Sequence, residues 1–412
     1  MAGKRILVTI DGNWLAHVTR ALEIAKVLRT MGHQIYFAGG GDYMRLAAEA
    51  DFSISSLKTV QPDKLLETTR RGRANWHNYE TLKEFVEEDL GLFERIEPDL
   101  VLNDMRLSVP TACKAANMPL AAILNASWTN YYTIKVRGVE NSRIGEFIRR
   151  TIGRKLARRL GLAEKVKQLI LIRDSSCIRK LRKEMRLPSC KNLWEAMQGD
   201  LNLLCDIPEY APTNDLPSHF SYIGPVTWEP EEKLPAWLNQ LSPDRPTLYF
   251  TMGSTGNPGF FREAIDVFGD TKYQCLMTTG GMANIHQPPK NCFIADHAPG
   301  SAVAGKSNVV ICHGGNGTIY QAMSQGVPII GIPTMHDQEF NMQRVVDLGI
   351  GIQLNQLKWN RSDLIEAVEE VLAEKHYKTN AEEFKAILAN YRGSRKGAEL
   401  INGFCQQRLP RA

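Results

Sequence analysis

The stretch CHGGNGTIYQAMSQGVP, residues 312–328, places a histidine and three glycines directly before a run of helical periodicity, and a fourth glycine after it. The apolar residues VVIC (309–312) predict a buried strand, and TIYQAMSQG (318–326) predicts a helix that ends at a glycine cap. Between them, GGNG (314–317) forms a turn whose glycines allow another group to approach the backbone closely. The stretch therefore predicts a strand–turn–helix unit of an α/β fold.

Two interpretations of this turn stay open from the residues alone. Backbone N–H groups at the positive end of a helix dipole suit a phosphate, and His313 could add a hydrogen bond to the same anion. Alternatively, the turn serves only packing. A metal site is excluded, because Cys312 and His313 are adjacent at a strand end and point to opposite faces, and no second ligand pair has suitable spacing.

Strands alternate with helices on both sides of this unit. The apolar strand segments are 5–10, 34–41, 98–104, 119–125 and 201–207 in the first half, and 246–254, 274–281, 291–296, 307–315 and 327–333 in the second. Unbroken apolar strands that alternate with helices are typical of parallel sheets covered on both faces. The sequence therefore predicts an α/β protein with two parallel sheets.

A proline-containing, acidic segment, YIGPVTWEPEEKLPAWL (222–238), interrupts the alternation and marks a domain boundary. We assign residues 1–228 to a first domain and 229–390 to a second. Residues 391–412 form a C-terminal segment, for which a crossing back to the first domain stays open. Because open α/β sheets bind ligands at the carboxyl ends of their strands, we expect a cleft between the two sets of ends.

The composition indicates a globular protein that does not span a membrane. Hydrophobic residues make up 43% of the 412 residues and charged residues 23%, and no apolar run approaches the roughly 20 residues of a membrane span. Eight cysteines occur without a C-x-x-C pair, which argues against a zinc ribbon or disulfide scaffold and indicates a reducing compartment. The apolar run at the N-terminus is too short for a signal peptide. We therefore expect a cytoplasmic protein.

One basic block, residues 143–189, carries 15 Lys and Arg against four Asp and Glu, whereas the whole chain has a net charge of +5. Apolar residues at three- and four-residue spacing between positions 144 and 160 predict an amphipathic basic helix. Its basic face is either simply solvated or a peripheral contact with an anionic membrane. Nucleic acid is disfavoured, because the block lacks interleaved aromatic residues and any nucleic-acid motif.

Three consecutive segments, HGGNGT (313–318), QAMSQGVPIIGIP (321–333) and DQEFNMQRVVDLGIG (337–351), together resemble the donor-nucleotide motif of family 1 glycosyltransferases. This family includes the plant and animal UDP-glycosyltransferases and the bacterial macrolide-type enzymes. PTLYFTMGS (246–254) and LPAWL (234–238) are similar to further segments of the family. The resemblance implies a GT-B fold, in which two Rossmann-like parallel-sheet domains face each other across a cleft, the first binding the acceptor and the second the nucleotide-sugar donor.

The resemblance also assigns the donor-binding residues. The residues that would hold the diphosphate are His313, Gly315, Asn316, Gly317 and Thr318, assisted by Ser254. Asp337 and Gln338 would bind hydroxyls of the donor sugar. Two positions depart from the family: His297 stands where a tryptophan usually stacks on the base, and Gln321 where UDP-using members commonly carry a ribose-binding glutamate. A neutral amide loses a charge-assisted hydrogen bond, so dTDP stays open beside UDP, the nucleotide that the resemblance favours.

In the first domain, DGNWLAHVTR (11–20) resembles the family's G-x-x-G-H-x-x-P pattern, with Ala16 and Arg20 as departures. The resemblance implies that His17 is the general base, and Asp104, which ends the strand PDLVLND, its carboxylate partner. Asn13, Asn125 and Trp128 are candidates for the acceptor side, and they complete the list of predicted site residues.

The sequence as a whole predicts an inverting hexosyltransferase that needs neither metal nor cofactor and uses a nucleotide sugar and a hydroxyl-bearing acceptor, small or lipophilic. A nucleotide-sugar epimerase and a non-catalytic nucleotide-sugar-binding protein remain as alternatives on the same scaffold. A nicotinamide dehydrogenase is disfavoured, because the first turn, DGNWLA, lacks G-x-G-x-x-G spacing.

Overall fold

The computed structural model consists of two compact units. It describes residues 3–62, 65, 77–135, 162–231, 233–253, 256–355 and 359–408. Among these, the first unit comprises the residues up to Trp228 together with those from Arg392 onward, and the second runs from Glu229 to Tyr391. Ser254 and the predicted basic helix between residues 144 and 160 lie outside the described residues.

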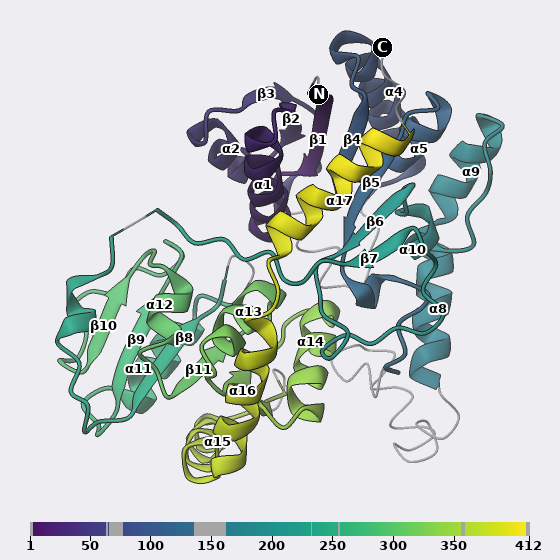
Figure 1. The fold of residues 1–412 in the computed structure, drawn as a ribbon. Helices are drawn as coiled ribbons and strands as arrows, with labels where there is room; N and C mark the ends of the chain where they lie inside the picture. The colour runs from purple at the N-terminus through teal and green to yellow at the C-terminus, as the bar shows by residue number, and fades with distance from the viewer. Residues whose placement is uncertain are drawn as a thin grey trace. The chain divides into compact units, whose positions relative to one another are not determined.

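The first unit contains a seven-stranded parallel sheet with the order β3-β2-β1-β4-β5-β6-β7 (Figure 1). Its strands are β1 (Arg5–Asp11), β2 (Gln34–Gly40), β3 (Ser53–Ser56), β4 (Leu100–Asp104), β5 (Leu120–Leu124), β6 (Leu201–Leu204) and β7 (Phe220–Tyr222). The strand order reverses between β1 and β4, where the register pairs Ile10 with Asp104. This switch point is where an open α/β sheet offers room for a ligand.

Helices connect these strands. They are α1 (Leu15–Thr30), α2 (Arg45–Glu49), α4 (Tyr79–Ile96), α5 (Val109–Ala115), α8 (Leu162–Asp174), α9 (Ser176–Glu184), α10 (Leu193–Ala196) and α17 (Gly393–Arg408), with short 3-10 turns η1 (Asp42–Met44) and η2 (Ala126–Trp128). The last helix, α17, packs along α1 (Figure 1). Its buried Ile401 joins the same apolar cluster as Ile24 and Leu28 of α1, so the end of the chain belongs to the first unit.

The second unit contains a six-stranded parallel sheet with the order β10-β9-β8-β11-β12-β13. Its strands are β8 (Thr247–Thr251), β9 (Gln274–Thr278), β10 (Cys292–Ala295), β11 (Val309–Cys312), β12 (Ile329–Gly331) and β13 (Gly351–Gln353). The helices are α11 (Phe260–Phe268), α12 (Gly300–Ala304), α13 (Asn316–Ser324), α14 (His336–Asp347), α15 (Arg361–Ala373) and α16 (Lys375–Leu388), preceded by η3 (Ala236–Asn239). The strand order again reverses next to β8, between β8 and β11.

The predicted pair of parallel α/β sheets is confirmed. The strands β4, β5, β8, β9 and β11 are buried along their whole length, as their unbroken apolar runs require. Three edge strands, β3, β7 and β13, were not predicted, because each has only three or four residues, too few for a recognisable pattern. Among the described residues, no helix is long and apolar enough to cross a bilayer.

Candidate active site

His17 and Asp104 meet at the carboxyl edge of the first sheet. Asp104 is the last residue of β4, and His17 lies in the first turn of α1, which follows β1. Nδ1 of His17 is 2.8 Å from Oδ1 of Asp104. The Asp104 side chain is completely buried, whereas 12% of the His17 side chain is exposed. The two residues predicted at neighbouring strand ends therefore form a buried carboxylate–imidazole pair.

Arg20, which the sequence presented only as a departure from a motif, grips the same carboxylate. It lies one turn after His17 on α1, and its Nε and Nη2 donate to the two oxygens of Asp104, Nη2 at 2.8 Å. Burial alone would raise the pKa of Asp104, but the positive charge of Arg20, together with the hydrogen bonds from Arg20 and His17, holds this pKa below its usual range. Asp104 is therefore ionised at neutral pH.

Asn125 and Trp128, two of the three acceptor-side candidates, surround the same group. Oδ1 of Asn125 accepts a hydrogen bond of 2.5 Å from Nη1 of Arg20. The Trp128 ring centroid is 5.8 Å from that of His17, and the guanidinium carbon of Arg20 lies 5.6 Å from the same ring. Trp128 also stacks on Trp194 of α10, with ring centroids 6.2 Å apart. Trp194 was not predicted from the sequence.

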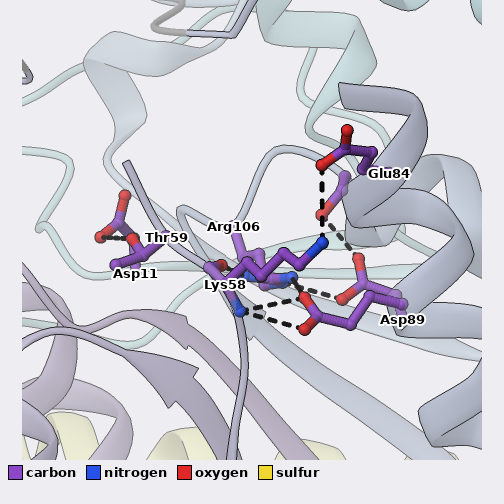
Figure 2. A network of polar contacts seen from close by, with 8 residues as sticks. Asp11, Lys58, Thr59, Glu84, Asp89 and Arg106 are labelled. Atoms are coloured by element: carbon purple, nitrogen blue, oxygen red, sulfur yellow. Dashed lines mark hydrogen bonds and ion pairs between the residues drawn. The ribbon is translucent and has the colours of Figure 1, made fainter. Parts of the chain in front are cut away.

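Asn13, the third acceptor-side candidate, has a different local role. Its Nδ2 lies 2.9 Å from Asp11 Oδ1, 2.9 Å from Thr59 Oγ1 and 3.0 Å from the carbonyl oxygen of Val60. Figure 2 shows Asp11 and Thr59 joined at the edge of a larger polar network. Asn13 thus ties the turn after β1 to the loop after β3.

His313, in the second unit, is a buried and uncharged imidazole. It follows β11 directly and is 5% exposed. Burial lowers its pKa to about 4, so the ring is neutral above mildly acidic pH. Its Nδ1 is buried and has no hydrogen-bond partner among the described residues. The ring therefore brings no positive charge to this turn at neutral pH.

Glycines form the walls around this ring. A Cβ atom at Gly253 would lie 2.5 Å from Cε1 of His313, and one at Gly315 would lie 2.5 Å from its Nε2. Gly314 adopts a φ of +85°, in the left-handed region that favours glycine. Over Gly317, in contrast, a Cβ would meet nothing within 4 Å, so the backbone there is open to an approaching group.

The helix α13 begins at Asn316, two residues earlier than predicted, with Gly315 as its N-cap. Gly315 provides no side chain to cap the first N–H groups, and Gly317 and Thr318 lie within the first turn. Asn341 of α14, which was not assigned a role from the sequence, donates a 3.1 Å hydrogen bond to the carbonyl oxygen of Gly314 and fixes the turn. The turn therefore holds N–H groups at a helix end that suits an anion.

The two predicted sugar-binding residues lie in the first turn of α14, in different surroundings. Asp337 is exposed, whereas Gln338 is 2% exposed. Oε1 of Gln338 accepts hydrogen bonds from the backbone N and the Oγ1 of Thr334, at 2.8 and 3.0 Å. The carbonyl end of Gln338 thus holds the loop after β12.

Gln321 is joined to a carboxylate that sequence reasoning missed. Its Nε2 donates to Oε1 of Glu229 at 3.2 Å, and the same oxygen accepts from the N and Oγ of Ser301, at 3.2 and 2.5 Å. A Cβ at Gly300 would lie 2.6 Å from Oε1 of Gln321, so the glycine makes room for this amide. His297 lies exposed in the loop after β10.

The positions of the cysteines and histidines also decide whether they can serve as metal ligands. Among the residues that the structure describes, no group of three or more His, Cys, Asp or Glu side chains is arranged to hold a metal ion. Cys312 is fully buried, and this burial raises the pKa of its thiol to about 12. It is therefore a protonated strand residue behind the turn.

Comparisons with known proteins identify the class. Residues 287–390 match the model of the UDP-glucoronosyl and UDP-glucosyl transferases. Over 381 residues, the chain is 31% identical to the PGL/p-HBAD biosynthesis rhamnosyltransferase of Mycobacterium bovis (strain BCG / Pasteur 1173P2), covering 92% of this chain and 83% of that protein. Among solved structures, the calicheamicin glycosyltransferase CalG4 matches 100% of both chains with a TM-score of 0.72 at 18% identity.

A second structural neighbour is the spinosyn rhamnosyltransferase SpnG complexed with thymidine diphosphate, with a TM-score of 0.69 at 16% identity, covering 97% of this chain and 99% of that chain. Two parallel-sheet domains with these relatives define an enzyme of the GT-B glycosyltransferase class. Within that class, the chain belongs to family 1, the UDP-glycosyltransferase family, as its sequence resemblance predicts.

Proposed function

We propose that this glycosyltransferase moves a hexose from a nucleotide diphosphate sugar to a hydroxyl group of a small or lipophilic acceptor, with inversion and without a metal ion. His17 acts as the general base. The observation that carries this proposal is the 2.8 Å contact between Nδ1 of His17 and the ionised Asp104. When Nδ1 carries the proton and donates it to the carboxylate, Nε2 has a free lone pair for the acceptor hydroxyl.

The proposed reaction is a single displacement. Nε2 of His17 takes the proton as the acceptor oxygen attacks the anomeric carbon from the face opposite the nucleotide. The bond between that carbon and the diphosphate oxygen breaks, and the diphosphate leaves with the electron pair. Asp104 stabilises the imidazolium that forms. In the second unit, the first turn of α13 and the neutral imidazole of His313 stabilise the leaving diphosphate through hydrogen bonds and the helix dipole.

UDP remains the favoured nucleotide, and dTDP is the second candidate. Glu229 supports UDP, because it brings a carboxylate to Gln321, the position where the amide alone lacks charge. The relative named a rhamnosyltransferase and the neighbour complexed with thymidine diphosphate favour a dTDP-linked deoxyhexose. Calorimetric titration of the protein with UDP and with dTDP separates the two, and Glu229→Gln should weaken UDP binding more than dTDP binding if the carboxylate contacts the ribose.

Peripheral membrane contact through the basic block, residues 143–189, is a further part of the proposal. Two apolar side chains in the block, Leu169 and Ile172 of α8, are 66% and 41% exposed and lie one turn apart. Arg182, in contrast, is 1% exposed and donates a 3.0 Å hydrogen bond to the carbonyl oxygen of Ala196, so this part of the block has a structural role. Co-sedimentation with anionic vesicles tests the contact: charge reversal between 149 and 159 should abolish it, and unchanged binding refutes it.

The decisive experiment is a screen of donors and acceptors read by mass spectrometry, in the presence of EDTA. We expect a glycosylated acceptor that appears with EDTA present and disappears in His17→Ala, while this variant still binds the donor. Full transfer by His17→Ala would refute the role of His17. Sugar turnover without any acceptor would indicate an epimerase, and donor binding without turnover a non-catalytic binding protein.

A further inference from the structure

Arg20 is buried and fully hydrogen-bonded, unlike a surface arginine, and its side chain contacts His17, the proposed base. Its side chain is 8% exposed, and each of its three nitrogens has a partner: Nε and Nη2 bind Asp104, and Nη1 binds Asn125. Such a fork on a carboxylate fixes the orientation of both groups. Asp104 cannot turn away from His17 without breaking two charge-assisted hydrogen bonds.

The position of Arg20 also bears on the tautomer of His17. Nη2 of Arg20 lies 3.1 Å from Nδ1 of His17, and Oδ1 of Asp104 lies 2.8 Å from the same nitrogen. A guanidinium can only donate, so a bond from Nη2 to Nδ1 would place the ring proton on Nε2 and remove the base. The carboxylate is the shorter contact and the stronger acceptor. By holding Oδ1 in place, Arg20 favours the tautomer with the proton on Nδ1.

The charges around His17 come from three elements. Asp104 of β4 and Arg20 of α1 touch it, and Asp11 of β1 attracts it from further away. Because Arg20 neutralises Asp104, the pair exerts less attraction on an imidazolium than Asp104 would alone. Behind Arg20, Asp206 adds a more distant negative charge, which acts on the guanidinium.

From this geometry, we infer that Arg20 is a positioning residue that keeps His17 unprotonated and in the Nδ1–H tautomer, and so extends transfer activity to lower pH. The inference rests on the proposed role of His17 as the base. Without the guanidinium, the buried carboxylate would attract a proton to His17 more strongly, and the base would be blocked up to a higher pH.

Arg20→Met and Arg20→Gln remove the positive charge, and Arg20→Lys retains it without the fork. In the pH profile of kcat/KM, we expect the acid limb of both neutral variants to move upward by about one to two pH units. Their activity relative to the unmodified enzyme should be at least about tenfold lower at pH 6 than at pH 8.5. Arg20→Lys should keep the acid limb within about half a unit of its original position and lose activity evenly across pH.

Arg106 provides a matched control, because it forms a second buried ion pair in the same unit, with Asp89 in place of Asp104. Its Nε lies 2.8 Å from Oδ1 of Asp89, with 4% and 0% of the two side chains exposed. Figure 2 shows this pair beside Lys58 and Glu84. Arg106→Met should lower thermal stability as Arg20→Met does, but leave the acid limb in place.

A purely structural Arg20 predicts that Arg20→Met and Arg20→Gln lose the same factor at every pH, in proportion to the folded fraction, and this result would overturn the inference. A measurement on the unmodified protein needs no variant: ¹⁵N NMR of labelled histidine should show His17 protonated on Nδ1 at pH 7. A proton on Nε2 would also overturn it. If His17→Ala retains full activity, the proposed function fails instead, whatever the arginine variants do.

Discussion

Acid should weaken the second unit in part through His313. Its pKa is lowered to about 4 by burial, whereas an unfolded histidine titrates near 6.5. Between these two pKa values, His313 takes up a proton in the unfolded chain but stays neutral in the folded protein. Stability present at pH 7.5 is therefore lost as the pH falls toward 4, and no further loss from this residue follows below it.

The two pKa values set the size of the effect. Their separation of about 2.5 pH units corresponds to about 3–4 kcal/mol at about 1.4 kcal/mol per pH unit, and most of it, about 2–3 kcal/mol, should be lost by pH 4.5. His313→Gln cannot titrate. The difference in unfolding free energy between the unmodified protein and His313→Gln should therefore shrink by this amount between pH 7.5 and pH 4.5, whatever the substitution costs at neutral pH.

Urea-dependent hydrogen exchange, read on the amides of β11, measures this difference within the second unit. Using the difference between two proteins cancels every other group that titrates over the same range. His286→Gln, at an exposed histidine of the same unit, is the control for the effect of replacing a histidine by glutamine. A difference for His313→Gln that stays constant within about 0.5 kcal/mol from pH 7.5 to 4.5 would refute the assignment of a buried neutral imidazole.

Three further predictions concern other residues. Gly315→Ala should lower the free energy of unfolding by about 1–3 kcal/mol, because its Cβ would meet the neighbouring ring of His313. Gly317→Ala has open space over it and should not lower the melting temperature. Equal losses of stability in the two variants would contradict the packing argument. Asp104→Asn leaves a buried guanidinium without its carboxylate and should cost about 3–5 kcal/mol in urea unfolding, and a loss below about 1 kcal/mol would contradict it. Maleimide labelling of the native protein, read by mass spectrometry, should modify half-buried Cys177 well before buried Cys312, and the reverse order would contradict the thiol burial.

Patterns local in the sequence predicted much of the fold. The strand–turn–helix at 309–324 follows from four apolar residues, a glycine turn and helical periodicity, which depend on neighbours in the chain. The pairing of His17 with Asp104 required one further step, namely that carboxyl ends of adjacent parallel strands share an edge. The short strand β13 could not be found this way, because three residues carry no periodicity.

The missed site residues act across long stretches of sequence. Arg20 meets a carboxylate 84 positions away, and Glu229 meets an amide 92 positions away, so no local pattern links either pair. One signal did exist for Arg20: it shares a helix face with Ile24 and Leu28, which are fully buried. A charged residue on an apolar helix face must find a partner in the interior, because an unpaired buried charge is too costly.

The two candidate sites use charge in opposite ways. In the first unit, the positive charge of Arg20 is balanced by the negative charge of Asp104. Arg20, Asp104 and a neutral His17 together therefore carry no net charge. In the second unit, residues 313–325 contain no Lys, Arg, Asp or Glu, and His313 is uncharged at neutral pH. A diphosphate held there would be bound by backbone N–H groups and the dipole of α13, whose strength does not depend on a proton. In this arrangement, the pH dependence of sugar transfer would arise from the pair of His17 and Asp104. The turn at residues 313–318 would add nothing to this pH dependence near neutral pH.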